Sequence, residues 1–404
     1  MRFVVVGGGV AGVCCAEELC RLRPQDEVTL VSASRVLKGV SVVARLSRNL
    51  EELALVERRL DELPYSNLRL VQDVAAGIDT EGQALLLGGG GRLPYDKLCI
   101  CAGARPKELP PSVFHASGEQ PAGGVPTQQA PQAQQADRDA ELAALRQRVL
   151  TIRDTDSVAR LAARLRRSRR VVVVGNGGIA LELISGLKGA DVTWVMKHAH
   201  IGDAYFDLDA AQFLLEELQH QRRVAAAAAA AAADGGLRVN RQMQSSDPAI
   251  YAAGDSASCQ WAADESRHWF QMRLWSQARA MGVYAAHCMA GVQDQTGSDM
   301  AFELFTHVTR FLGKKVVLLG LYNGQRLGGE AEQDVVTYSR IDEEPEGRSF
   351  VRVLLLRGRV QGAVLIGETD LDETLENLIM DQLDVGSYGP HLLDPDVELD
   401  HVFD

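Results

Sequence analysis

Two glycine-rich turns, each placed between an apolar strand and a helix, constrain the fold of this chain more than any other feature. The first turn lies in Val4-Val5-Val6-Gly7-Gly8-Gly9-Val10-Ala11-Gly12. It follows a strand predicted at 2–6, opens a helix predicted to run to about Arg23, and leads to a strand predicted at 27–32. A strand, a helix and a strand linked in this way form the repeating unit of a parallel sheet.

Each residue type in this turn has a physical task. Gly7 permits the tight turn, Gly9 lets the backbone approach a pyrophosphate, and Gly12 allows close packing of the helix. The N-terminus of the helix presents oriented N–H groups to the anion. We therefore predict a dinucleotide site at Gly7, Gly9, Ala11 and Gly12.

Ser32 stands where this motif usually carries an acidic residue for the adenosine ribose, about twenty residues further along the chain. A serine hydroxyl binds a ribose more weakly than a carboxylate does. Dinucleotide affinity is therefore expected to depend more on the pyrophosphate and the rest of the cofactor. Ser32 and Val74 are still included in the predicted cofactor site.

A second unit of the same kind runs from 170 to 196, and its turn is Gly175-Asn-Gly-Gly-Ile-Ala180. We expect Gly175, Gly177 and Ile179 to bind the pyrophosphate of a nicotinamide dinucleotide. The strand after the helix leads to Met196-Lys197-His198, which lacks the carboxylate that would select NADH. Lys197 gives a slight preference for NADPH or for dual use. Two such units imply one domain for each cofactor of a hydride-transfer pair.

Composition narrows the class of protein. The 404 residues are 46% hydrophobic and carry a net charge of −12, which predicts a globular protein of two or three domains. The chain enters its first strand directly and has no apolar run of about 18 residues, so we expect no signal peptide, no membrane span and an intracellular, reducing compartment. The basic cluster Arg164 to Arg170 has five arginines in seven positions. We interpret it as a solvated face and expect no direct nucleic-acid binding.

The seven cysteines form neither a zinc spacing nor a secreted disulphide framework. Cys99 and Cys101 lie in an apolar run, where core packing is expected. Cys14 and Cys15 lie in the first turn of the first helix, whose dipole would stabilise a thiolate, but burial is the preferred interpretation. No histidine spacing indicates a metal site.

Two further motifs carry a family resemblance. Cys101-Ala-Gly-Ala-Arg-Pro106 and Ile250-Tyr-Ala-Ala-Gly-Asp255 resemble the closing FAD fingerprints of the pyridine nucleotide-disulphide oxidoreductase superfamily. The matching aspartate of that superfamily, here Asp255, bonds the ribityl chain of the flavin. The resemblance thus implies that FAD is bound by Ala102, Gly103 and Asp255. Three tryptophans lie near the second of these motifs: Trp261, Trp269 and Trp275. One of them is a candidate for stacking on the flavin ring, for which Trp275 is included in the predicted site, and core packing is the alternative.

The resemblance covers nearly the whole chain. Four sequence segments narrow it to one group within the superfamily: 152–157, 174–182, 271–275 and 362–371. It implies a FAD protein that oxidises NAD(P)H in nucleus and cytoplasm, including the muscle sarcomere, and acts in oxidative-stress defence. It also implies a protective, NAD(P)H-dependent association with the tRNA-splicing ligase. In related flavoenzymes, the glutamate that matches Glu182 pairs with a basic residue beside the flavin N5, for which Lys38 and Arg45 are the candidates here. A solvated glutamate on the helix surface is the alternative.

The chain departs from the disulphide-reducing members at one point. Those members carry one or two cysteines shortly after the second strand, whereas no cysteine lies between Ser34 and Asn67. A thiolate has to lie against the flavin to exchange electrons with it. Direct disulphide reduction is therefore not expected.

We predict an α/β protein with two Rossmann-like domains, which bind FAD and NAD(P), and a C-terminal α+β domain. The predicted segments are a first FAD half (1–109), a disordered insertion (110–148), a truncated NAD(P) domain (149–224), a polyalanine linker or gap (225–235), a second FAD half (236–295) with a helix at 269–289, and a C-terminal domain (296–404) with a helix at 369–382 and an acidic tail. The truncation follows from nine consecutive alanines, Ala225 to Ala233, where further strands are expected.

The predicted activity is hydride transfer from NAD(P)H to the flavin and then to oxygen, a quinone-like molecule or a protein. A second hypothesis is a flavin-bound module that turns over slowly and protects a partner in an NAD(P)H-dependent way. A third is a chain that binds FAD but no longer accepts hydride, because its nicotinamide domain is incomplete. The oligomeric state is left open.

Overall fold

The computed structural model describes residues 1–47, 50–59, 62–106, 108–109, 143–152, 154–197, 200–221, 235–259, 261, 266–292, 302–344, 347–367 and 369–397. These residues belong to two compact units. The first comprises Met1–Gly103, Val173–Gly186 and Trp194–Asp404, and the second comprises Ala104–Val172 and Leu187–Thr193. The polyalanine run lies outside the described residues.

A parallel five-stranded sheet is the centre of the FAD half. Its strands are β1 (Arg2–Val6), β2 (Glu27–Ser32), β5 (Leu68–Gln72), β9 (Lys97–Ile100) and β13 (Ile250–Ala252), in the order β13-β9-β1-β2-β5. Their Val- and Leu-rich sequences suit strands covered on both faces. The strand that follows β1 in the chain, β2, pairs with one edge of β1, and the later strand β9 pairs with its other edge. The switch point of the sheet therefore lies beside the first glycine turn.

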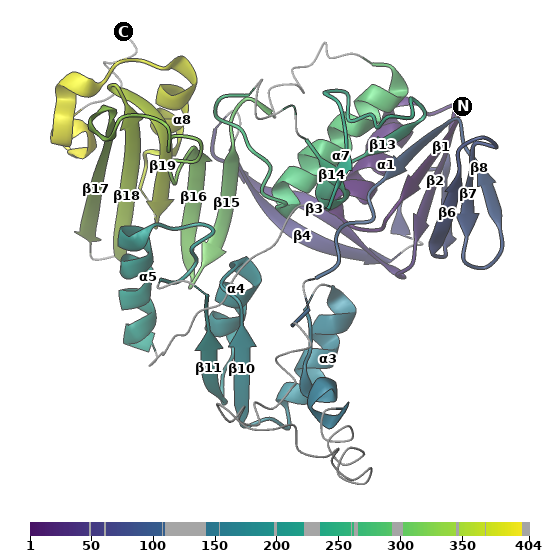
Figure 1. Cartoon of the computed structure of the whole chain (residues 1–404), viewed down its shortest axis with the longest axis horizontal. Helices are drawn as coiled ribbons and strands as arrows, with labels where there is room; N and C mark the ends of the chain where they lie inside the picture. Colours follow the sequence, from purple (N-terminus) through teal and green to yellow (C-terminus); the bar gives the residue numbers. More distant parts are fainter. Residues whose placement is uncertain are drawn as a thin grey trace, which may run out of the picture. The chain divides into compact units, whose positions relative to one another are not determined.

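Helices α1 (Val10–Leu22) and α7 (Trp275–Ala290) lie side by side on this sheet (Figure 1). Their small residues allow a close approach, since a Cβ at Gly282 of α7 would lie 2.2 Å from the carbonyl oxygen of Ala11 in α1. Phe3, Val13 and Met281 belong to the core beneath them. The two halves of the predicted FAD domain thus form one packed structure.

The cysteine-free segment after β2 is a long antiparallel hairpin of β3 (Val36–Arg45) and β4 (Glu51–Arg59). A small antiparallel sheet of β6 (Ala75–Asp79), β7 (Ala84–Leu87) and β8 (Arg92–Pro94) then leads into β9. Two short strands, β12 (Leu237–Arg238) and β14 (Ala257–Ser258), pair on either side of β13 in the sequence.

The second glycine turn joins β10 (Arg170–Val174) to α4 (Gly178–Gly186), and β11 (Asp191–Val195) follows. The N–H groups of Asp191 and Gly175 donate to the carbonyl oxygens of Arg169 and Val195 at 2.8 and 3.0 Å, so β10 and β11 run parallel. Within the described ranges this sheet has two strands, and Val172 is 63% exposed. One face of β10 is therefore uncovered in the part of the domain that the structure describes.

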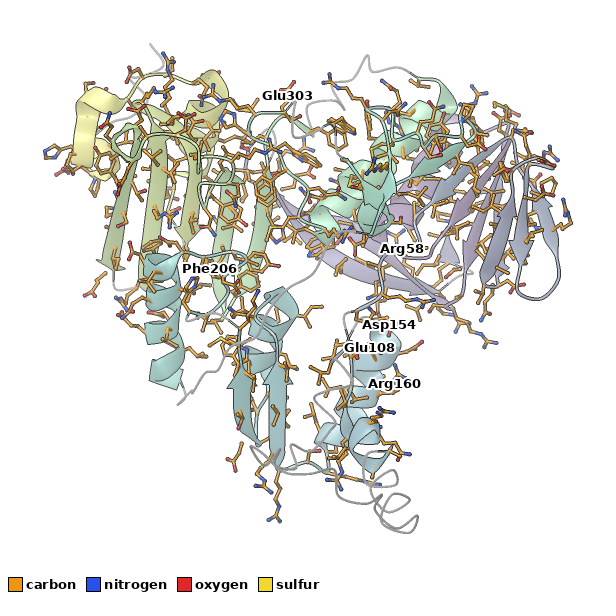
Figure 2. All side chains as sticks on the ribbon, in the orientation of Figure 1. Arg58, Glu108, Asp154, Arg160, Phe206 and Glu303 are labelled. Atoms are coloured by element: carbon orange, nitrogen blue, oxygen red, sulfur yellow. The ribbon has the colours of Figure 1, made fainter. Side chains whose placement is uncertain are left out.

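Two helices flank this sheet in the sequence. Helix α3 (Thr155–Leu165) begins with a capping box in which Asp154 accepts the N–H of Ser157 at 2.8 Å (Figure 2). Helix α5 (Leu208–Gln221) packs on the C-terminal sheet, where Phe213 meets Phe350 with ring centroids 5.6 Å apart.

The C-terminal domain is an antiparallel sheet of β15 (Thr306–Phe311), β16 (Lys314–Gly320), β17 (Val335–Glu344), β18 (Gly347–Leu356) and β19 (Arg359–Ile366), in the order β15-β16-β19-β18-β17. Helix α8 (Asp372–Asp381) packs on β16 and β19. Single-turn or irregular 3-10 segments occur at η3 (Gly254–Ser256), η5 (Glu332–Asp334) and η6 (Gly386–Leu393). The predicted α+β domain is thus present.

Two predictions of local structure are wrong. Residues 143–148, placed in a disordered insertion, are helical, because Ala, Leu, Arg and Gln are good helix formers; residues 110–142 lie outside the described ranges. The helix expected from Trp269 begins only at Trp275, since Leu274 is extended and Arg273 has a φ of +55°.

Candidate cofactor site

The first glycine turn tolerates no other residue at two positions. Gly7 has a φ of +121°, and a Cβ there would lie 2.1 Å from the carbonyl oxygen of Cys101. A Cβ at Gly12 would lie 1.9 Å from the carbonyl oxygen of Gly7. The N–H of Gly7 also donates to the carbonyl oxygen of Val31 at 2.8 Å, which ties the turn to β2. The tight turn at Gly7 and the close packing of the helix at Gly12 therefore both require glycine, as predicted.

Gly9 is different, because a Cβ there would meet nothing within 4 Å. It is the N-cap of α1, its backbone is extended, and no side chain caps the helix. The first turn of α1 also lacks acidic residues. The N–H groups at this end thus face open space that suits an anionic group.

A second helix adds its positive end to the same region. Ala11 of α1 approaches Gly282 of α7, and further along Glu18 meets His287 at 2.7 Å, so the two helices run parallel. The first turn of α7 likewise has no acidic residue and no side-chain cap. Two helix dipoles therefore point their N-termini toward one end of the sheet, which stabilises negative charge there.

Asp255 lies beside these helix ends. It sits in η3 directly after β13, and a Cβ at Gly254 would lie 2.9 Å from that of Ala11 and 3.5 Å from that of Ala278. The hydroxyl of Ser256 donates to the carbonyl oxygen of Ile100 at 2.8 Å, which fixes this turn to the end of β9. Ala102 and Gly103 follow β9 directly, and Gly103 has a φ of +72°. The predicted FAD residues thus gather at the carboxyl ends of β1, β9 and β13.

Ser32 ends β2 at this same edge and is 3% exposed. Its hydroxyl donates to the carbonyl oxygen of Ser34 at 2.9 Å and accepts the N–H of Ser34 at 3.2 Å. A Cβ at Gly8 would lie 2.4 Å from the Ser32 hydroxyl, so the side chain packs against the glycine turn. Val74 follows β5 and is 58% exposed. Whether either residue binds a ribose stays a prediction.

Lys38 and Arg45, the two candidate partners of Glu182, occupy different surroundings. The backbone N–H of Lys38 donates to the carbonyl oxygen of Gly8 at 2.9 Å, so Lys38 adjoins the glycine turn. Arg45 instead pairs with Glu51 at 2.8 Å, and Glu51 also accepts from Arg279 at 2.9 Å. Lys38 is therefore the better placed of the two.

Glu182 lies on an exposed side of α4, and partial desolvation of its carboxyl raises its pKa. In the part of the chain that the structure describes, it forms no ion pair with Lys38 or Arg45. The pairing that the resemblance implied is thus not formed in this structure, and a role of Glu182 in hydride transfer stays a prediction.

The second glycine turn is braced from the loop that follows β11. The side-chain amide of Asn176 donates to Asp203 at 2.6 Å and its oxygen accepts the N–H of Gly202 at 2.7 Å. The indole N–H of Trp194 donates to the carbonyl oxygen of Gly175, whose φ is +134°, at 2.7 Å. A Cβ added at Gly177 would have no neighbouring atom within 4 Å, and Ile179 is 56% exposed. This turn also leaves room for a ligand.

Lys197 follows β11 by two residues and is half-buried. His198 lies outside the described residues. The choice between NADH and NADPH therefore rests on the sequence alone.

Tyr205 is a residue that the sequence analysis missed. Its hydroxyl lies against Gly178 at the start of α4, where a Cβ would come within 2.9 Å of the hydroxyl oxygen, and the residue is 9% exposed. No sequence signal marks it, since it lies outside the turn motif and reaches α4 through the fold. Trp194 was missed for the same reason.

The cysteines near the first turn are buried, as predicted. Desolvation by burial raises the pKa of Cys14 to about 12, so the helix dipole does not stabilise a thiolate there. The sulfurs of Cys99 and Cys101 lie 3.5 Å apart, and this contact together with burial raises the pKa of Cys101. In the described residues these thiols are core side chains.

Two of the three candidate tryptophans pack on each other. The rings of Trp261 and Trp269 are stacked with centroids 6.1 Å apart, and Phe302 contacts both at their edges. Trp275 begins α7 at the cofactor end of the helix and is half-buried. Core packing therefore accounts for Trp261 and Trp269.

The residues present fit FAD. A dinucleotide needs a backbone that it can approach closely, a positive helix end for its pyrophosphate, and a carboxylate for its ribityl hydroxyls. Gly9 offers the first, the N-termini of α1 and α7 the second, and Asp255 the third. Among the described residues, no group of three metal-binding side chains occurs, and no helix is long and apolar enough to span a membrane.

Comparison with known proteins agrees with this geometry. Residues 1–228 match the family described as pyridine nucleotide-disulphide oxidoreductase. A mouse protein, "Pyridine nucleotide-disulfide oxidoreductase domain-containing protein 1", is 32% identical over 531 residues, covering 100% of this chain and 98% of the mouse protein. The 531-residue alignment is longer than this 404-residue chain, so parts of the mouse protein face gaps here.

Solved structures share the fold. A ferredoxin reductase from Rhodopseudomonas palustris superposes with a TM-score of 0.67 at 19% identity and covers 99% of each chain. A water-forming NADH oxidase from Lactobacillus brevis gives a TM-score of 0.64 at 17% identity, with 95% of this chain and 91% of that chain covered. At these identities the likeness concerns the two Rossmann-like domains and the C-terminal domain.

Proposed function

Because the chain belongs to the pyridine nucleotide-disulphide oxidoreductase family, we propose that it is a FAD-dependent oxidoreductase that oxidises NAD(P)H. The observation that carries the proposal is the convergence of Gly9, Asp255 and the N-termini of α1 and α7 at one edge of the parallel sheet. When bound, FAD supplies the acceptor for a hydride from the nicotinamide.

The residues of the chain hold and orient the cofactors. The first turn of α1 would hold the pyrophosphate through its N–H groups, and Asp255 would accept hydrogen bonds from the ribityl hydroxyls. The N-terminus of α7 offers partial positive charge for negative charge on the flavin. Lys38, held beside Gly8 by its backbone, is the basic residue that we place at the flavin, and Glu182 of α4 is its partner when a nicotinamide nucleotide is bound.

The electron acceptor is not a protein disulphide in this proposal. The hairpin of β3 and β4 contains no cysteine, and Cys14 and Cys101 are buried with raised pKa values. A buried neutral thiol is a poor nucleophile. Oxygen, a quinone-like molecule or a protein is the remaining acceptor class, and a role in oxidative-stress defence in nucleus and cytoplasm, including the sarcomere of muscle, follows from the resemblance.

A second candidate function is a flavin-bound module that protects a partner and turns over slowly. The observation in its favour is the short β10–β11 sheet, whose Val172 is 63% exposed in the described part of the chain. By resemblance, the tRNA-splicing ligase is the proposed partner, bound in the presence of NAD(P)H.

An anaerobic absorbance titration tests both functions. The purified yellow protein is titrated with NADH and then with NADPH, and the flavin bands are followed. Bleaching supports hydride transfer, and turnover with oxygen or a quinone then separates the enzyme from the slow protective module. Bound FAD that stays oxidised with both nucleotides contradicts the proposed activity and leaves a flavin-binding scaffold. A protein that binds no FAD contradicts the proposal altogether.

A further inference from the structure

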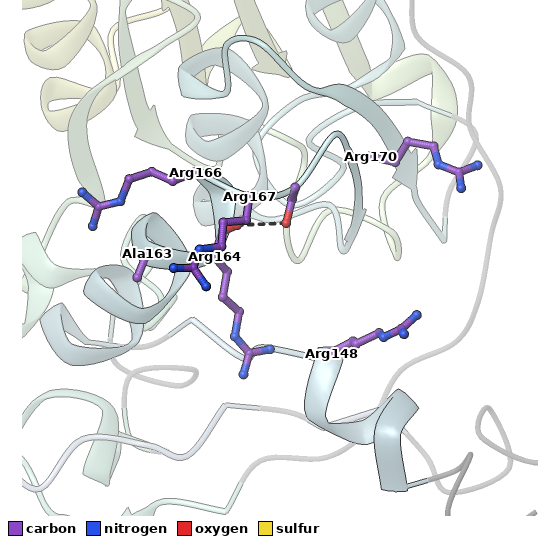
Figure 3. Close-up of a pocket in the computed structure, with 7 residues that line it drawn as sticks. Arg148, Ala163, Arg164, Arg166, Arg167 and Arg170 are labelled. Atoms are coloured by element: carbon purple, nitrogen blue, oxygen red, sulfur yellow. Dashed lines mark hydrogen bonds between the residues drawn. The ribbon is translucent and has the colours of Figure 1, made fainter.

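An arginine-lined hollow lies in the second compact unit, apart from the residues assigned to FAD or nicotinamide binding. It has a volume of about 820 Å³ and is lined by Arg148, Ala163, Arg164, Arg166, Arg167, Ser168 and Arg170 (Figure 3). These residues come from the helix at 143–148, the end of α3 and the start of β10. The sequence alone favours a solvated face for the 164–170 cluster.

The five arginines of this hollow have no carboxylate partners among the described residues. Several other arginines of the chain pair with carboxylates, as in Arg58 with Glu17 at 2.7 Å and Arg357 with Glu330 at 2.7 Å. Of the lining arginines, Arg164 donates to the backbone carbonyl of Gln147, a neutral acceptor. In a chain of net charge −12, five guanidinium groups that have no carboxylate partner in the described ranges lie around one hollow, and they repel each other unless an anion joins them.

Capping of a helix does not account for so many arginines. A cation near the C-terminus of α3 stabilises the helix dipole, and Arg164 and Arg166 occupy that place. Arg148 and Arg170 belong to other elements, so they do not serve this purpose. Because three elements contribute, the arginine set is a feature of the folded unit.

The site is separate from the nicotinamide turn. Nucleotides bind at the carboxyl ends of strands in doubly wound sheets. Arg170 is the first residue of β10, whereas Gly175 follows its last residue. The side chain of Arg170 therefore lies at the opposite end of the strand from the predicted pyrophosphate contacts.

The lining indicates the class of ligand. Arginine is the side chain best suited to bind phosphate through paired N–H groups. The two other lining residues, Ala163 and Ser168, offer no aromatic surface on which a base would stack. Figure 3 shows the labelled arginines spread around the hollow, which suits several phosphate groups better than a single one. We propose that this hollow binds a compact polyphosphate anion, such as inorganic tripolyphosphate or an inositol polyphosphate.

Calorimetry on the full chain with sodium tripolyphosphate tests the proposal. The variant Arg164→Gln/Arg166→Gln/Arg167→Gln should weaken binding at least about tenfold, because three charge-assisted contacts are lost. A control with the same change of net charge, Arg92→Gln/Arg160→Gln/Arg357→Gln, alters arginines outside the hollow and should stay within about twofold. Orthophosphate should bind much more weakly than tripolyphosphate, and inositol hexakisphosphate should compete with it.

Three outcomes overturn the inference: no binding of tripolyphosphate, equal loss in both triple variants, or tighter binding of a single-stranded oligoribonucleotide of about ten nucleotides at the same arginines. The last outcome identifies a nucleic-acid surface instead. Unchanged circular dichroism and FAD content in both variants show that the substitutions at these exposed positions leave the fold intact. The result is independent of the oxidoreductase proposal, since no cofactor contact is altered.

Discussion

The hydroxyl of Tyr205 lies against the backbone of Gly178, the first residue of α4. A Cβ at position 178 would lie 2.9 Å from the Tyr205 oxygen and 3.6 Å from Cε1 of Phe311, so this packing favours glycine there. The Tyr205 ring is held by Phe311, with ring centroids 5.2 Å apart. The Tyr205 hydroxyl therefore fills space beside the N-terminus of α4, where a pyrophosphate would bind.

Removal of this hydroxyl should strengthen nicotinamide binding. In Tyr205→Phe the ring contacts remain, and the space that the hydroxyl fills beside Gly178 becomes open to the pyrophosphate. We expect the Kd for NAD⁺ to fall roughly fivefold, which corresponds to about 1 kcal/mol. Quenching of tryptophan fluorescence provides the measurement, because Trp194 bonds to Gly175 in the same turn. Tyr388→Phe, in η6, is the control, and an unchanged or larger Kd in Tyr205→Phe contradicts the competition.

Gly9 and Gly12 should respond differently to alanine. A Cβ at Gly9 meets only open space, so Gly9→Ala should keep its thermal stability without FAD and lose affinity for FAD by at least about tenfold. A Cβ at Gly12 lies 1.9 Å from the Gly7 carbonyl, so Gly12→Ala should destabilise the apoprotein itself by about 1–3 kcal/mol.

Thermal melts of the apoproteins and FAD titrations separate the two effects. Gly328→Ala is the matched control, since a Cβ there also meets nothing within 4 Å and its φ is not left-handed. If Gly9→Ala binds FAD as tightly as the Gly328→Ala control, the pyrophosphate does not approach Gly9.

The sequence predicted those parts of the fold that depend on local pattern. The strands before both glycine turns, the helices after them and the C-terminal sheet follow from periodicity and turn chemistry. The β3–β4 hairpin, and the contacts of Tyr205 with Gly178 and Arg45 with Glu51, depend on residues brought together by folding. No local pattern specifies such pairs. The sequence alone therefore does not show that Arg45 pairs with Glu51.

Lys38 and Arg45 are now distinguishable as partners of Glu182. Lys38→Gln should slow anaerobic flavin reduction by NADH roughly tenfold, because it removes the charge beside the glycine turn. Arg45→Gln should stay within about twofold, since Arg45 is 70% exposed and pairs with Glu51. Stopped-flow absorbance measures both rates.

The double variant Lys38→Gln/Glu182→Gln completes the test. If the two residues act as a pair, it should be no slower than Lys38→Gln alone. Independent, additive losses would show that Glu182 serves another purpose, and a slow Arg45→Gln protein would restore Arg45 as the partner.

His307 should make the fold sensitive to acid. It is 3% exposed in β15, its Nδ1 lies 3.1 Å from the Ser276 hydroxyl of α7, and burial lowers its pKa to about 4. Between about pH 6.5 and pH 4, His307 is protonated in the unfolded chain but stays neutral in the folded chain. The free energy of unfolding therefore falls as the pH falls. This histidine alone should cost about 2 kcal/mol of unfolding free energy between pH 7 and pH 5.

Urea unfolding of the wild type and of His307→Gln at these two pH values measures that loss. The variant lacks the titrating group, so its own loss on acidification should be smaller by about the same 2 kcal/mol, even where its stability at pH 7 is lower. Burial also lowers the pKa of His268, so part of the acid sensitivity should remain in the variant. His391→Gln alters a side chain that is 77% exposed and should leave the pH dependence unchanged. An equal loss in the wild type and His307→Gln would show that His307 is protonated within the fold, and that the contact between β15 and α7 opens to water in acid.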